Sequence, residues 1–285
     1  MLRVIDFLYA IYMMLLLLFV LGLCVGSFLN VLVERLPRNE SVLFGRSHCD
    51  HCKHKLLWYE LIPLVSFFIQ KGKSRCCHKR LSFQYPLVEL ITGIGFVLLF
   101  RLLLALRSFS EVGPPLSLPS ILYLLFSIVV FCSLLVIFIA DLKYEIIPME
   151  MIITGIIGIF VYQGMQFFVL HTSYFVLRDY FVGILFPAIL AFLFFFCLWF
   201  FTKGRAMGDG DMYLSFLIGL ITGFPKIIVS LYAAFLTGAA AGVILILQRK
   251  KGLKSHIPFG PFLIVGSVIA LVFGDAIIIW WRTLW

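Results

Sequence analysis

The sequence predicts an all-α polytopic membrane protein, and both its composition and its long uncharged runs point to this class. Of its 285 residues, 62% are hydrophobic and only 13% are charged, whereas a soluble domain is about half apolar and about a quarter charged. The mean hydropathy is +1.09. One aqueous core cannot bury that much apolar surface, so we expect most of the chain to lie in a bilayer.

The apolar runs define the expected helices. A helix that rises about 1.5 Å per residue needs about 20 apolar residues to cross the hydrocarbon. Because a helix satisfies its own backbone hydrogen bonds in lipid, we expect a bundle of about eight transmembrane helices, with a loop subdomain after the first. In chain order the runs are residues 7–33, 81–100, 121–140, 151–177, 180–202, 212–225, 227–248 and 255–281.

The basic residues predict the orientation. With eight helices, 17 of the 23 Lys and Arg residues lie in the connections 34–80, 141–150, 203–211 and 249–254. Basic loops stay on the cytoplasmic side, so we expect both termini outside and the long loop of residues 34–80 in the cytoplasm. The net charge of +9 is then a topological signal and an attraction to membrane lipid, and it does not indicate a nucleic-acid partner.

Two aspartates are expected at this same face of the membrane. Asp141 follows the run 121–140, and Asp211 precedes the run 212–225. An ionisable group at the edge of a bilayer is costly and indicates function. If the two converge, one carboxylate can activate water while the other, protonated, polarises a scissile carbonyl. The spacing alone does not show that they meet, and a solvated helix end is the simpler interpretation of either aspartate by itself.

A polytopic transporter or channel with interfacial acidic residues is the alternative. It predicts acids near the middle of the bilayer and helices broken there. Six of the eight runs carry no charged residue, which favours an enzyme acting at the membrane edge.

Six short stretches follow one another in a distinctive order. They are "GSFLNVLVERLP" (26–37), "YELIPLVSF" (59–67), "YPLVEL" (85–90), "DLKYEIIP" (141–148), "GDGD" (208–211) and "IPFGPF" (257–262). The fourth resembles an aspartate-to-Ile-Pro motif, and the fifth fits the G-x-G-D signature of intramembrane aspartyl proteases. Across almost the whole chain, the set resembles the bacterial type IV prepilin peptidases.

The resemblance implies Asp141 and Asp211 as the catalytic pair. It implies that the enzyme removes the basic leader from type IV prepilin and pseudopilin precursors at the cytoplasmic face of the bacterial inner membrane. It also implies methylation of the new N-terminus by S-adenosylmethionine, without indicating which residues hold this donor. The family commonly has a lysine two residues after the second aspartate, where this chain has Tyr213.

The same resemblance implies that two different parts of the chain carry the two activities. Residues 1–84, the first transmembrane helix and the cytoplasmic cysteine-containing loop, are expected to be associated with methylation. Residues 85–285 are expected to form the transmembrane aspartyl peptidase bundle.

Four of the seven cysteines lie in the long loop. "CDHC" (49–52) is a C-x-x-C, the usual turn that supplies two zinc thiolates, and a reducing compartment argues against disulfides. The family often has a second such turn, but alignment places Ser74 at its first cysteine position, with Cys77 at the second and Cys76 displaced by two.

Three arrangements of the loop therefore stay open. In the first, zinc is held by Cys49, Cys52, Cys77 and either Cys76 or His78. In the second, an imidazole replaces the missing ligand, from His48, His51 or His54. In the third, the loop folds without metal.

Overall fold

The structure is a computed structural model that describes residues 2–42, 44–49, 51–108, 118–169, 181–205, 207–248 and 258–283. Within these residues the regular secondary structure is helical, apart from two isolated β-bridges in the loop after the first helix. The chain forms two compact units, Met1–Cys132 and Ser133–Trp285. The all-α class predicted from the sequence is confirmed.

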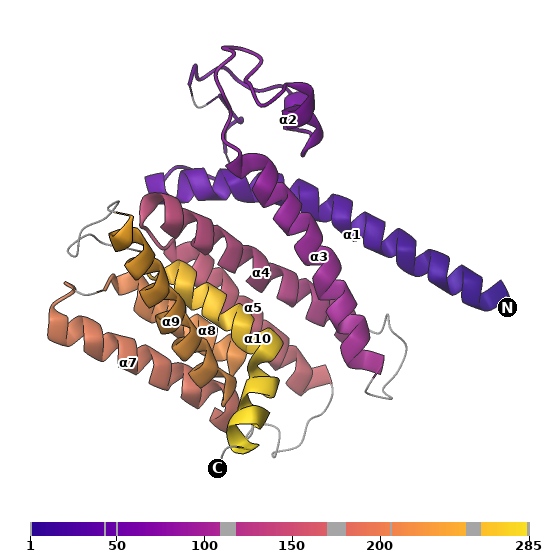
Figure 1. The fold of residues 1–285 in the computed structure, drawn as a ribbon. Helices are drawn as coiled ribbons and strands as arrows, with labels where there is room; N and C mark the ends of the chain where they lie inside the picture. The colour runs from indigo at the N-terminus through magenta and orange to yellow at the C-terminus, as the bar shows by residue number, and fades with distance from the viewer. Residues whose placement is uncertain are drawn as a thin grey trace. The chain divides into compact units, whose positions relative to one another are not determined.

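Long helices make up most of both units (Figure 1). Short elements lie between them: η1 (Leu36–Arg38), η2 (Trp58–Leu61), α2 (Val65–Ile69) and the π-helix η3 (Phe181–Leu185). The long helices are α1 (Leu2–Arg35), α3 (Gln84–Ser108), α4 (Leu118–Tyr144), α5 (Met149–Val169), α7 (Phe186–Thr202), α8 (Asp209–Thr222), α9 (Lys226–Leu247) and α10 (Gly260–Thr283).

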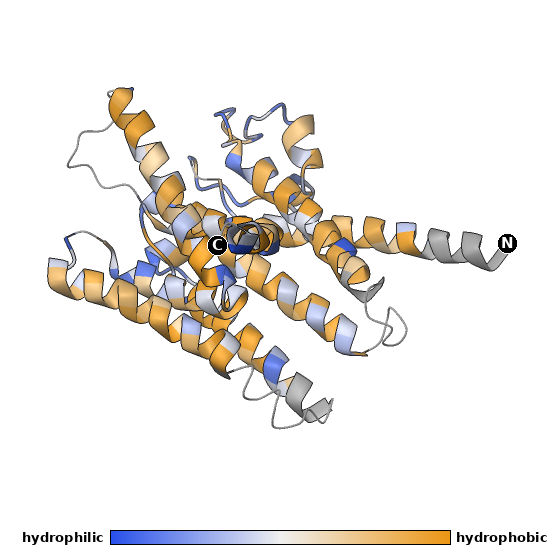
Figure 2. Cartoon of the chain, turned by 60° about the horizontal axis from the view of Figure 1, so that its bottom comes forward, coloured by the Kyte–Doolittle hydropathy of each residue, from blue (hydrophilic) through white to orange (hydrophobic). Residues whose placement is uncertain are grey.

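Hydropathy identifies this chain as a polytopic membrane protein. Among the described residues, six helices are long and apolar enough to cross a bilayer, and a seventh apolar helix, Met149–Met165, is shorter. Figure 2 shows apolar residues along most of the length of the long helices. The predicted count of eight spans is not confirmed. Helix α8 has only 14 residues and begins with two acids, so it rises about 21 Å, less than the roughly 30 Å of hydrocarbon.

In the first unit, α1 and α3 pack closely and antiparallel. A Cβ atom at Gly22 would lie 2.7 Å from the Cα of Gly93, and one at Gly26 would lie 2.7 Å from the Cα of Glu89. Small residues allow two helix backbones to approach this closely in a membrane. This contact places the end of α1 beside the start of α3, at the two points where the long loop leaves and returns (Figure 1).

In the second unit, α8 lies among other helices. It contacts α5, α7, α9 and α10, and nine of its fourteen residues are buried. A Cβ atom at Gly219 would lie 2.5 Å from the Cα of Ala188, so α7 and α8 are in close contact. This position among neighbouring helices explains how a short helix with an acidic first turn is accommodated.

Candidate active site and cysteine cluster

Asp141 lies in the last turns of α4 and is only 4% exposed. The backbone N–H of Gly260, the first residue of α10, donates a hydrogen bond to its carboxylate. A Cβ atom at residue 260 would lie 2.5 Å from Asp141 Oδ2, which is far inside van der Waals contact. The "IPFGPF" stretch therefore brings a glycine against the aspartate at a place where a side chain does not fit.

Asp211 lies in the first turn of α8 and is 6% exposed. The helix is preceded by Gly208, which has extended backbone angles (φ −69°, ψ 154°) and whose backbone N–H donates to the Asp211 carboxylate. The N-terminal end of a helix carries partial positive charge and favours a nearby anion. Although the apolar run begins only at residue 212, the helix starts at Asp209 and includes the aspartate.

The structure brings Asp141 and Asp211 together. Burial removes Asp211 from water, and its carboxylate also interacts electrostatically with that of Asp141. Within the described part of the chain, Asp141 Oδ2 and Asp211 Oδ1 are both buried without a hydrogen-bond partner. Two buried carboxyl groups that interact electrostatically are most stable when they share one proton. The pair can therefore present one base and one acid to a substrate.

Ile147 is a site residue that the sequence analysis did not single out. It lies in the connection between α4 and α5, and a Cβ atom at Gly210 would be 2.8 Å from its Cβ atom. A Cβ atom at Gly260 would be 3.3 Å from its Cδ1 atom. One isoleucine side chain thus packs against both glycines that flank the aspartates.

Asp209 and Tyr213 have different surroundings from Asp211. Asp209 is exposed, and its Oδ1 accepts the backbone N–H of Gly210 at 3.0 Å. The ring of Tyr213 packs against Phe192 of α7, with ring centroids 5.9 Å apart. Tyr213, at the position where the resemblance implies a lysine, is therefore part of an aromatic contact between α7 and α8.

The long loop of the first unit contains two similar turns. In one, the backbone N–H of Lys53 donates to the carbonyl of Cys49 at 2.9 Å. In the other, the N–H of His78 donates to the carbonyl of Ser74 at 2.8 Å. Both Lys53 and His78 have positive φ angles, 59° and 56°. Ser74 thus occupies the place that Cys49 occupies in the first turn.

The turns bring four cysteines into one cluster. The Sγ atoms of Cys49, Cys52, Cys76 and Cys77 all lie within 4.8 Å of one another, and none of the histidines described in the loop belongs to the group. Cys76, which the alignment displaces by two positions, is in the cluster because its Sγ lies 2.9 Å from that of Cys52.

Ser74 joins the two turns through hydrogen bonds to sulfur. Its hydroxyl lies 3.3 Å from Cys49 Sγ and 3.0 Å from Cys76 Sγ. Burial disfavours the Cys49 thiolate, but hydrogen bonds from Ser74 and from the backbone of Cys52 favour it more, and together they lower the pKa of Cys49 to about 6. The hydrogen bond to Cys76 raises the pKa of Cys52 to about 12.

Two family models match different parts of the chain. Residues 20–103 match the Bacterial Peptidase A24 N-terminal domain, and residues 128–243 match the Type IV leader peptidase family. No solved structure matches the chain.

Several curated relatives are named prepilin leader peptidase/N-methyltransferase. The Bacillus subtilis protein is 32% identical over 93% of this chain and 96% of its own length. The Myxococcus xanthus protein is 34% identical over 82% of this chain and 64% of its own length. The Pectobacterium carotovorum protein is 29% identical over 89% of this chain and 91% of its own length. These matches, with the two aspartates brought together at the ends of α4 and α8, show that the chain belongs to the type IV prepilin leader peptidase/N-methyltransferase family.

Proposed function

We propose that the protein is a membrane aspartyl endopeptidase that removes the leader peptide of type IV prepilin and pseudopilin precursors. The single observation that carries this proposal is the pairing of two buried aspartates, Asp141 and Asp211, that come from separate helices and interact electrostatically. The names of the relatives support the substrate class.

In the proposed mechanism the pair acts as base and acid. The ionised carboxylate takes a proton from a water molecule, whose oxygen attacks the scissile carbonyl carbon. The protonated carboxyl donates its proton to the carbonyl oxygen, as in other aspartic proteases. The carbon–nitrogen bond then breaks. The leaving amine takes a proton from the acid formed in the first step, and a hydroxyl of the tetrahedral intermediate returns its proton to the other carboxylate as the carbonyl forms again. The N–H groups of Gly260 and Gly208 hold the two carboxylates in place.

The proposed topology matches this chemistry to the substrate. All eight long helices are embedded in the inner membrane, α8 within the bundle, with both termini outside and the loop of residues 34–80 in the cytoplasm against the lipid surface. Asp141 and Asp211 are then at the cytoplasmic face. A precursor anchored by an apolar helix, with its basic leader in the cytoplasm, presents its cleavage site at this depth.

Methylation of the new N-terminus is the proposed second activity. The relatives are named N-methyltransferases, and S-adenosylmethionine supplies the electrophilic methyl group in such reactions. We assign this activity to residues 1–84, the first helix and its loop, and cleavage to residues 85–285.

The cysteine cluster is the proposed zinc site. Four thiolates around a tetrahedral zinc lie about 2.3 Å from the metal and therefore roughly 4 Å from one another, and the sulfurs of Cys49, Cys52, Cys76 and Cys77 are within 4.8 Å. Zinc would tie the two turns together and hold the loop folded, which is a structural role.

Co-expression with a prepilin precursor in a host that lacks such a peptidase tests this function. Intact mass spectrometry is expected to show the shortened pilin carrying one added methyl group, and the precursor alone to remain unprocessed. A precursor that stays uncut beside normally inserted protein would contradict the proposal and would favour a transport role.

A further inference from the structure

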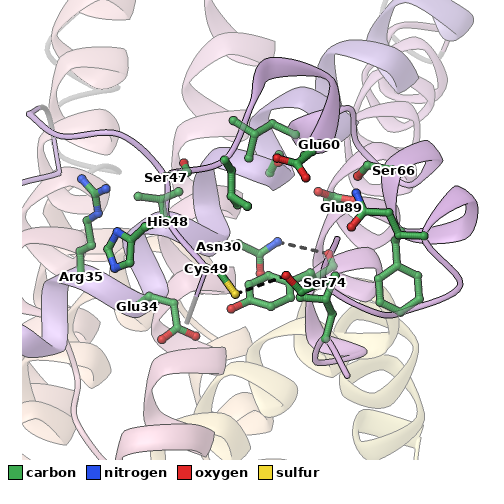
Figure 3. A pocket seen from close by; sticks show the side chains of 18 of the residues that line it. Asn30, Glu34, Arg35, Ser47, His48, Cys49, Glu60, Ser66, Ser74 and Glu89 are labelled. Carbon is green, nitrogen blue, oxygen red and sulfur yellow. Dashed lines mark hydrogen bonds between the residues drawn. The ribbon is translucent and has the colours of Figure 1, made fainter. Parts of the chain in front are cut away.

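Helix α2 in the long loop of the first unit turns its apolar side chains outward. The side chains of α2 and the residue after it that line a cavity between α1, α3 and the loop are Ser66, Phe67 and Gln70, and Figure 3 shows Ser66 there. The opposite face consists of Val65, Phe68 and Ile69, spaced as one face of a helix, and these are 50%, 68% and 75% exposed. A helix in water buries its apolar face, so this arrangement indicates an apolar surrounding outside α2.

The start of α2 is attached to a transmembrane helix. The backbone N–H of Leu64 donates to Glu89 Oε2 at 2.8 Å, and the Ser27 side chain of α1 is also hydrogen-bonded to Glu89. Glu89 is the sixth residue of α3 and lies roughly 8 Å from the start of that helix. Because Gln84–Ala105 is long and apolar enough to cross a bilayer, α2 begins at the depth of the membrane interface. Amphipathic helices bury their apolar face at this depth.

Phe83 connects α2 with the apolar surface of α3. Its ring contacts that of Phe67 in α2, with centroids 6.0 Å apart. The N–H of Leu87 donates to the carbonyl of Phe83 at 3.3 Å, so Phe83 extends the helical geometry of α3. Exposed apolar side chains continue along the same face at Leu87, Ile91, Ile94 and Leu98. One lipid surface can therefore cover the outward side chains of both helices.

Positive charge follows α2 directly. Between Glu60 and Glu89 the sequence contains no acid and five basic residues, which are Lys71, Lys73, Arg75, Lys79 and Arg80. All five are exposed, and in the part of the chain that the structure describes none of them forms a salt bridge. Lys73 and Arg80 lie opposite each other in an antiparallel bridge, where like charges destabilise the pairing. Anionic headgroups would supply the missing negative charge.

We propose that α2, Phe83 and these five basic residues form a docking surface for anionic lipid of the surrounding bilayer. The apolar side chains enter the boundary between headgroups and acyl chains, and the basic side chains bind the lipid phosphates. This inference rests on the proposed topology and goes beyond it, because it assigns the contact to particular residues and to one class of lipid. Docking holds the loop that we assign to methylation at the membrane surface, where cleavage releases the new N-terminus.

Photolabelling from the lipid tests the docking surface in the intact protein. The purified full-length chain is placed in nanodiscs of phosphatidylcholine and phosphatidylglycerol that contain a lipid with a diazirine near the start of its acyl chain. After irradiation, mass spectrometry maps the adducts. We expect adducts at Phe68 or Ile69 of α2 and at Phe83, and those on the transmembrane helices show that the probe works. Labelled transmembrane helices beside an unlabelled α2 would overturn the proposal.

The role of charge is tested by discs that contain phosphatidylcholine alone. Adducts on α2 of the wild type are expected to be fewer there than in the anionic discs. The double variant Lys73→Gln/Arg80→Gln should lose this difference, whereas Arg205→Gln, which removes an exposed arginine of the second unit, should keep it. Equal labelling of wild-type α2 in both kinds of disc would show that anionic lipid is not the partner. This comparison uses the wild type, so it holds whether or not the double variant folds.

Two further readouts separate the docking surface from other interpretations. If α2 is labelled in discs that hold one chain but not in discs that hold two, its apolar face binds a second copy, and the proposal is wrong. Precursor cleavage is measured in the same discs. Cleavage by a wild type whose α2 is unlabelled would overturn the docking surface and leave the proposed function standing. A labelled α2 without cleavage would support the docking surface and contradict the proposed function.

Discussion

Asp141 and Gly260 show how the absence of one side chain shapes the candidate active site. The aspartate is buried at the end of α4, and the glycine at the start of α10 leaves room for its Oδ2 atom. Even a methyl group at residue 260 would overlap this oxygen and press on Ile147. The carboxylate would then have to turn away from Asp211.

Gly260→Ala is therefore expected to lower the rate of precursor cleavage by about 100-fold, the usual cost of displacing a reacting group by about 1 Å. The matched control is Gly164→Ala in α5, where an added Cβ meets nothing within 4 Å. Initial cleavage rates on one precursor, at equal amounts of inserted protein, compare the two. Equal rates for Gly260→Ala and the control would show that the tight contact has no role in placing Asp141.

At this scale the sequence could identify the aspartates but not their neighbours. Asp141 and Asp211 stand out because acids at the edges of apolar runs are costly, and because their motifs resemble one family. The contact of Gly260 with Asp141, and that of Ile147 with Gly210, joins segments far apart in the chain. Nothing local to "IPFGPF" or to "EIIP" indicates which atoms each will touch.

At the scale of elements, the two turns of the long loop are similar in backbone and different in chemistry. Ser74 stands where a cysteine is expected at the start of the second turn. Cys76, which directly precedes Cys77 in the chain, supplies the fourth sulfur of the cluster instead. Alignment left Cys76, His78 and the first-turn histidines as alternatives, because ligand counting does not say which way each side chain points. The structure gathers the four sulfurs.

We expect the purified protein to carry one zinc ion per chain, and Cys76→Ser to lose most of it, since a hydroxyl is a poor replacement for a thiolate ligand. Cys197→Ser, which changes an exposed cysteine of α7, should retain the metal. Elemental analysis of both proteins after gel filtration provides the measurement. If Cys76→Ser kept its zinc while His78→Ala lost it, the ligand set would be wrong.

For the whole molecule, hydropathy could predict the class and the position of the long helices, since apolar runs are a local property. Hydropathy could not determine how many of these helices cross the bilayer. Helix α8 has 14 residues, and its contacts with four other helices rather than its length account for its place in the bundle. Pairing between runs depends on non-local contacts, such as Gly22 with Gly93, which no single segment encodes.

The proposed topology gives an expectation for the whole chain. Alkaline phosphatase fused after residue 285 should be active, because the proposed topology places the C-terminus outside, and phosphatase fused at Gly45 in the long loop should be inactive. Fluorescent protein fusions at the same two places should give the opposite pattern. An inactive phosphatase at the C-terminus beside an inactive one in the loop would mean an odd number of spans.

Asp141 and Asp211 are proposed to cleave the precursor together, and substitution of each aspartate by asparagine tests this. Cleavage rates of Asp141→Asn, Asp211→Asn and Asp209→Asn on one native precursor should be measured at matched membrane insertion. We expect the first two rates to fall at least about 1,000-fold, because an amide replaces neither the base nor the acid, and Asp209→Asn, which changes an exposed side chain, to retain cleavage. Cleavage at the wild-type rate by either Asp141→Asn or Asp211→Asn would contradict this proposal.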